Sequence, residues 1–103
     1  MGFKAEPGSY SKTALSDLQG AWGNLREAVV TQFGFPDSER LLFHIDEGMS
    51  WERVRDLKSM KETLLLVHNI AAGSASTEVN ECVAAVMESL DEVFIAITEG
   101  EKL

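Results

Sequence analysis

The sequence lacks several features that would assign it to a specialised class of protein. Among 103 residues there is a single cysteine, Cys82, which excludes an intramolecular disulfide and the disulfide-stapled small domains. No apolar run approaches the roughly 20 residues that a membrane-spanning helix needs. Only nine residues are Lys or Arg, and this shortage of positive charge argues against a nucleic-acid-binding protein. The lone cysteine and the absence of an apolar signal segment within residues 1–12 predict a cytoplasmic protein.

The residue patterns that support catalysis or cofactor binding are also missing. The sequence has no glycine-rich phosphate loop and no dinucleotide fingerprint. Cys82 falls within an apolar helical stripe, where a thiol is inert. His44 has one carboxylate, Glu47, three residues away, and a single such pair does not make a metal site. We therefore expect no enzymatic activity, no catalytic residues, no metal and no cofactor.

The composition is that of a globular domain with an acidic character. Apolar residues make up 45% and charged residues 25%, which is enough apolar surface to form a core. The formal net charge is -8, and the acidic residues are unevenly placed, with seven of them against one base, Lys102, after Ser74. Such an asymmetry can steer a basic partner, and it also serves solubility.

Hydrophobic periodicity predicts an all-α fold, a small bundle of three long helices and one short helix. Apolar residues recur every three or four positions over 11–33, 50–72 and 76–99, the pattern of amphipathic helices. Ser50 is the expected N-cap of the third helix. The short link at 73–76 predicts that the third and fourth helices form an antiparallel hairpin.

We expect one helical domain at 11–100, preceded by a flexible arm at 1–10 and followed by a short tail at 101–103. The segment 36–48 fits the remaining short helix, capped by Asp37, but it also fits a short strand at 40–46, where apolar and polar residues alternate. The helix is favoured because the sequence contains no second convincing strand.

Two glycines, Gly20 and Gly23, fall inside the first predicted helix. Each should cost about 1 kcal/mol relative to alanine at a helical position. Either the helix bends or begins after them, or another helix packs closely against them. We favour close packing.

The most suggestive surface lies on the last predicted helix. Four glutamates spaced by seven, four and seven residues line one side of it over roughly 27 Å: Glu81, Glu88, Glu92 and Glu99. Such a row can dock on a basic protein surface, or it can be a plain solvent face. Trp51 is a further candidate for partner binding, because exposed tryptophans are enriched at interfaces. An N-terminal packing staple is the alternative for this residue.

Two other surfaces are predicted. The end of the fourth helix is apolar on nearly all sides, which favours a homodimer contact there: Val93, Phe94, Ile95 and Ile97. Cations early in the third predicted helix fall partly along one side and form a candidate nucleic-acid contact: Arg53, Arg55, Lys58 and Lys61.

These patterns favour a small, acidic, non-enzymatic regulator or inhibitor that binds a protein with a basic surface through its C-terminal helix, as a homodimer. The first alternative is a dimeric DNA-binding transcriptional regulator that uses the basic cluster, although the net charge disfavours nucleic acid. The second is a helical bundle that holds a small ligand in an apolar cavity near Trp22 and His68. No membrane partner is expected.

Overall fold

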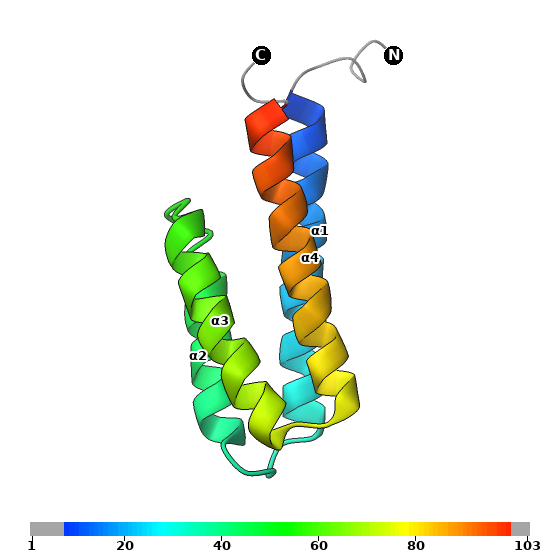
Figure 1. The fold of residues 1–103 in the computed structure, drawn as a ribbon, viewed down its shortest axis with the longest axis vertical. Helices are drawn as coiled ribbons and strands as arrows, with labels where there is room; N and C mark the ends of the chain where they lie inside the picture. Colours follow the sequence, from blue (N-terminus) through cyan, green and yellow to red (C-terminus); the bar gives the residue numbers. More distant parts are fainter. Residues whose placement is uncertain (1–7, 100–103) are drawn as a thin grey trace.

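The computed structural model describes residues 8–99, and only the backbone of residues 8–12 and 99. Within this range the chain is helical apart from short connections, and no strand occurs. The four helices are α1 (Gly8–Thr31), α2 (Ser38–Ser50), α3 (Leu57–Ser74) and α4 (Thr77–Glu99) (Figure 1). The predicted all-α fold is therefore confirmed.

The helices form a closed ring, in which α1 packs against α2 and α4, and α3 packs against the same two helices. Figure 1 shows consecutive helices running in opposite directions, as two pairs that lie side by side. The core lies between the pairs and receives large side chains from all four helices. The largest fully buried ones are Leu18, Trp22, Leu25, Leu41, Ile45, Met60, Leu64 and Leu90.

The connection from α1 to α2 turns at Gly34. Gly34 has a φ of 116°, a left-handed conformation that favours glycine. Its N–H donates a hydrogen bond to the Oγ of Ser38 at 3.1 Å, which ties the turn to the first residue of α2. Asp37 occupies the N-cap position of α2, but its side chain makes no capping hydrogen bond.

The structure corrects the alternative of a strand at 40–46. Leu41, Ile45 and Gly48 share the buried face of α2, a spacing of four and three residues that only a helix provides. The predicted arm at 1–10 is also too long, because α1 already begins at Gly8. The remainder of that arm, and the predicted tail at 101–103, lie outside the described residues.

The start of the third helix is the largest error in the sequence prediction. Ser50 ends α2 instead of capping α3, and its hydroxyl donates a hydrogen bond to the carbonyl oxygen of Glu47 at 2.7 Å. Residues 51–56 form a turn, and α3 begins at Leu57. Asp56 is the N-cap, and its carboxylate accepts hydrogen bonds from the backbone N–H of Ser59 at 3.0 Å and from its hydroxyl at 2.8 Å.

The predicted close packing at Gly20 and Gly23 is wrong. A Cβ built at either position has no heavy atom of a neighbouring element within 4 Å. Close packing occurs instead at Gly48, where a Cβ would overlap the ring of Trp22 and lie 2.8 Å from its Cζ2. The packing of α2 on Trp22 therefore requires a glycine at Gly48, and the sequence pattern did not identify that position.

The two helix pairs differ in length. At 1.5 Å per residue, α1 and α4 are each about 35 Å long, whereas α3 is about 27 Å and α2 about 20 Å. In Figure 1 the upper ends of α1 and α4 project beyond the turn that joins α2 to α3. One end of the long pair is therefore left without the short pair beside it.

Candidate functional site

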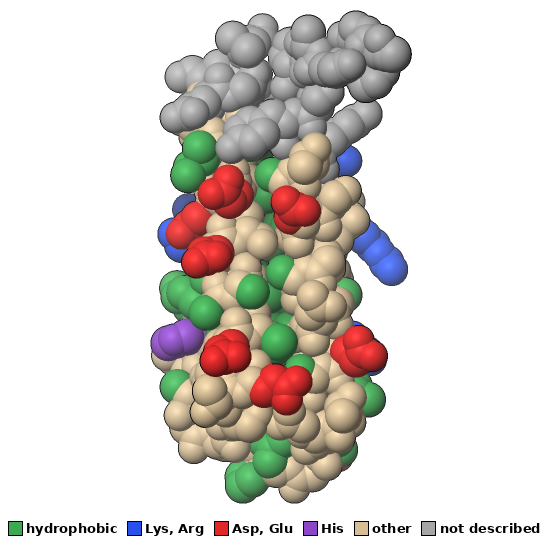
Figure 2. All heavy atoms as spheres, turned by 90° about the vertical axis from the view of Figure 1, so that its right-hand side faces the viewer, with side chains coloured by type: hydrophobic (Ala, Val, Ile, Leu, Met, Phe, Trp, Pro, Cys, Tyr) green, Lys and Arg blue, Asp and Glu red, His purple; other side chains and the backbone are tan. Residues whose placement is uncertain are grey.

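The outer surface of α1 and α4, turned away from α2 and α3, carries exposed carboxylates (Figure 2). Glu81, Glu88 and Glu92 are exposed on α4, and Glu78 near the start of the same helix is exposed as well. Asp17 adds a carboxylate from α1. We call these five residues the acidic face. Glu99 ends α4, but its side chain lies outside the described part of the molecule.

A shallow groove runs along this surface between the two helices. Small residues form its floor, with Gly20 and Ala21 on α1 and Ala85 on α4, while Asp17, Glu78 and Glu81 also line it. The small side chains leave the groove open, and the helices hold its carboxylates on a rigid frame. Sequence reasoning missed Asp17 because only the packing of α1 against α4 places it there.

Asp17, Glu81 and Glu88 of the acidic face have no ion-pair partner among the described residues. Between residues 13 and 98, ion pairs join Arg26 to Asp46 at 2.7 Å and His44 to Glu47 at 3.0 Å, and neither involves this surface. Glu78 accepts a hydrogen bond from the side-chain amide of Gln32 at 2.7 Å. The negative charge of Asp17, Glu81 and Glu88 is thus available to an external partner.

Cys82 lines the same groove. Partial burial raises the pKa of its thiol, and the neighbouring charges of Glu78 and Glu81 raise it further. A thiol in this environment stays protonated at neutral pH and is a poor nucleophile. Cys82 is therefore not placed to act as a reactive group, but the rate at which its thiol is labelled reports on the charge around the groove.

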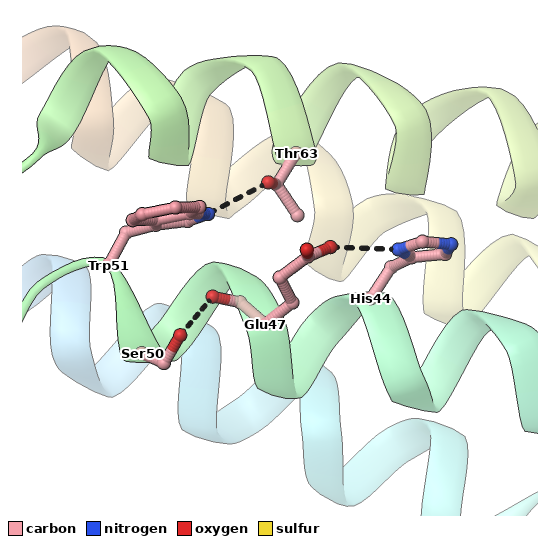
Figure 3. Close-up of polar contacts among 5 residues, drawn as sticks. All are labelled: His44, Glu47, Ser50, Trp51 and Thr63. Atoms are coloured by element: carbon pink, nitrogen blue, oxygen red, sulfur yellow. Dashed lines mark hydrogen bonds and ion pairs between the residues drawn. The ribbon is translucent and has the colours of Figure 1, made fainter.

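Trp51 lies at the end of α2, away from the acidic face on α1 and α4. Its ring is partly buried between α2 and α3, and its Nε1 donates a hydrogen bond to the Oγ1 of Thr63 at 3.0 Å (Figure 3). The contact ties the turn after α2 to the body of α3. Trp51 therefore packs as the C-cap residue of α2 and is not the predicted staple at the N-terminus of the third helix, which begins only after Asp56.

The four residues predicted as a dimer interface do not form one surface. Val93 is fully buried in the core, and Phe94 is partly buried with the Nζ of Lys61 5.9 Å from its ring centroid. Ile95 and Ile97 are exposed, but two residues correspond to about 200° around a helix, so they point to different sides. The prediction that all four form one contact is therefore wrong.

The basic cluster is also divided. Arg53 and Arg55 lie in the turn at 51–56, and Arg55 has a left-handed φ of 58°. Lys58 and Lys61 are exposed on α3. Because the arginines precede the helix, the four cations do not line one helical side, and the predicted row for nucleic-acid contact is not formed.

The predicted ligand cavity near Trp22 and His68 is not formed within the described residues. Trp22 is buried, and its Nε1 donates a hydrogen bond to the Sδ of Met60 at 3.4 Å, whereas His68 is exposed on α3. The hollow beside Trp22 measures about 50 Å³ and does not include His68. That volume holds little more than one water molecule.

The two histidines have no metal-binding surroundings in the part of the chain that the structure describes. His44 is hydrogen-bonded through Nδ1 to Glu47 (Figure 3), and no group of three or more His, Cys, Asp or Glu side chains there is placed to hold an ion.

Comparison with known proteins found no matching family model and no significant match among curated proteins or solved structures. None of the described helices combines the length and the apolar character that crossing a membrane would require. The function is therefore inferred from the geometry and charge of the acidic face.

Proposed function

We propose that this chain is a small, non-enzymatic regulator or inhibitor that docks its acidic face onto a protein with a basic surface. The observation that carries this proposal is the convergence of carboxylates from two helices on one open groove. Asp17, Glu81 and Glu88 have no cation beside them in the described part of the chain.

The groove suits a lysine or arginine side chain of the partner. The charged end of such a side chain would meet Asp17 on one rim or Glu81 on the other, while its aliphatic stem would lie on Ala21 and Ala85. The helices hold these groups in place before binding, which lowers the entropic cost of association. The wider negative field would accelerate the encounter with the partner.

A non-enzymatic role forms part of the same proposal. The thiol of Cys82 has a raised pKa, and His44 is bonded to Glu47 on α2 rather than to a nucleophile. The Ser59 hydroxyl donates a hydrogen bond to the Asp56 carboxylate at 2.8 Å, but this pair forms the N-cap of α3, and we assign it a structural role. Inhibition would then be steric, by occupation of the partner's basic surface. A cytoplasmic location, suggested by the lone cysteine, also belongs to this proposal.

Charge reversal at the acidic face tests the proposal. Glu81→Lys combined with Glu88→Lys changes the net charge by the same amount as Glu39→Lys combined with Glu62→Lys, a control pair on α2 and α3. All four side chains are exposed, so both variants should keep the helical circular-dichroism signal. Proteins captured by the wild type from native lysate at low salt would be identified, purified and titrated against each variant.

We expect the first variant to lose binding by at least tenfold, mainly through a slower association rate, while the control pair binds like the wild type. Equal binding by both variants would overturn the proposal. Recovery of nucleic acid in place of a protein would also contradict it, and would favour the DNA-binding alternative.

A further inference from the structure

The apolar stripe on the inner side of α4 continues past the region that α2 and α3 cover. Successive members of this stripe are Val86, Leu90, Val93 and Ile97, spaced by four, three and four residues. The first three are at most 2% exposed, whereas Ile97 is 40% exposed. The change occurs at the end of α4 that projects beyond the short helix pair (Figure 1).

The inner stripe of α1 changes in the same way at the same end. Leu18 and Trp22 are buried, but Leu15, one turn nearer the end of the helix, is only partly buried. The turn at 51–56 closes the short pair at this level, and its Val54 is 66% exposed. We call Leu15, Val54 and Ile97 the apolar step. Leu15 on α1 and Ile97 on α4 form its sides, and Val54 in the turn forms its floor.

We propose that a second copy of this chain occupies the apolar step, in a twofold, head-to-head dimer. The step is complementary to itself, because the projecting ends of one copy fill the space beyond α2 and α3 of the other. The inner sides of α1 and α4 from both copies would then face one another, and Ile97 and Leu15 would be covered. The contact is isologous, as expected for a twofold homodimer.

The charges at the two sides of the contact are complementary. The floor of the step carries Arg53 and Arg55 in the turn, followed by Lys58 in the first turn of α3, and all three are exposed. The end of α4 that would meet them in the second copy is the negative end of a helix, and it has no basic residue in its last turn. The head-to-head arrangement therefore places basic side chains against a negative helix end.

The dimer should be a weak one. The overlap is limited to the projecting ends of four helices, which puts it at or below the small end of specific interfaces, roughly 1,200 Å². We expect reversible dissociation on dilution. This contact is separate from the acidic face, because Ile97 and Val54 lie on the inner side of the long pair and at the turn. Either surface can therefore fail its test without affecting the other.

Sedimentation equilibrium of the full chain over a wide concentration range tests this inference. The wild type should show a monomer–dimer equilibrium. Ile97→Glu should raise the dissociation constant at least tenfold, because it buries a carboxylate in an apolar contact. Ile95→Glu is the matched control: it makes the same change two residues away, at a side chain 45% exposed that points to another side of α4.

A second variant keeps the test decisive even if Ile97→Glu disturbs the folding of the end of α4. Val54→Lys changes an exposed residue of the turn and should also weaken the dimer, whereas Arg40→Glu, at the opposite end of α2, should not. A wild-type chain that stays monomeric at every concentration would overturn the inference, as would a dimer unaffected by both Ile97→Glu and Val54→Lys. Loss of the dimer in Ile95→Glu alone would place the contact on the outer side of α4 and would equally overturn it.

Discussion

Substitution of three helical glycines by alanine provides a sharp test of the core packing. Gly20, Gly23 and Gly48 all lie in helices, where alanine is favoured over glycine by about 1 kcal/mol. A Cβ at Gly20 or Gly23 meets no heavy atom of a neighbouring element within 4 Å. We therefore expect Gly20→Ala and Gly23→Ala each to stabilise the protein by about 1 kcal/mol.

Gly48→Ala should have the opposite effect. The added methyl group would overlap the ring of Trp22, which is 2% exposed and held by the hydrogen bond from its Nε1 to Met60. Overpacking of a buried site costs about 1–3 kcal/mol, and the upper value applies where the neighbour cannot move away. After subtraction of the gain in helix propensity, the net loss is about 2 kcal/mol.

Urea denaturation followed by circular dichroism at 222 nm would measure all three variants. For a domain of this size, a loss of about 2 kcal/mol corresponds to a melting temperature lower by roughly 8–16 °C. In a double-mutant cycle, Trp22→Phe should relieve part of the cost of Gly48→Ala, because phenylalanine lacks the second ring of the indole. A Gly48→Ala protein as stable as Gly23→Ala would refute the close packing of α2 on Trp22.

Two further predictions follow from the titratable groups. Hydrogen bonds from Ser59 lower the pKa of Asp56 below its ordinary value of 3.8, so the cap stabilises the fold above that pH and loses its effect as the pH falls through the lowered pKa. The stability difference between the wild type and Asp56→Ala should thus shrink below about pH 4 in urea titrations, and a constant difference would contradict the cap. The thiol of Cys82 should react slowly with iodoacetamide at pH 8, and Glu78→Gln with Glu81→Gln should accelerate it. An unchanged rate would show that these carboxylates do not influence the thiol.

The long helices could be predicted because their apolar spacing is regular and their core positions follow from it. Leu18, Trp22, Leu25 and Val29 recur at intervals of three or four residues, and all four are buried. Burial of one continuous stripe is the main stabilising term for an amphipathic helix, so its spacing is a dependable signal. The bounds of α1 and α4 accordingly differ from the prediction by only a few residues.

The turn at 51–56 could not be predicted, because the sequence offers two competing N-caps. Ser50 and Asp56 are both good capping residues, and Val54 extends the apparent apolar spacing backwards from Leu57. In the folded chain Val54 is exposed, while Trp51 turns back to bond Thr63. That contact joins residues twelve positions apart and favours Asp56 as the cap. Capping preferences, which consider only neighbouring residues, cannot predict it.

The acidic face was only partly predictable for a similar reason. A row of glutamates on one helix can be read from spacing, and Glu81, Glu88 and Glu92 are indeed exposed. The pairing of α1 with α4, which brings Asp17 to the same groove, depends on how the helices assemble. Spacing along one helix carries no information about its neighbour.

The position of the α3 N-cap links the two proposed surfaces at the projecting end of the molecule. If α3 began at Ser50, six or seven more residues would extend it by about 10 Å, and it would cover the end of α4 near Ile97. Because the cap is Asp56, α3 does not reach that end, and Arg53 and Arg55 are placed in a turn at the foot of the step. The late cap thus exposes an apolar surface and sets positive charge beside it, which is the combination that a second copy with a negative helix end would match. The acidic face on the opposite side of the long pair remains free in such a dimer, so the paired molecule would present two copies of it to basic partners.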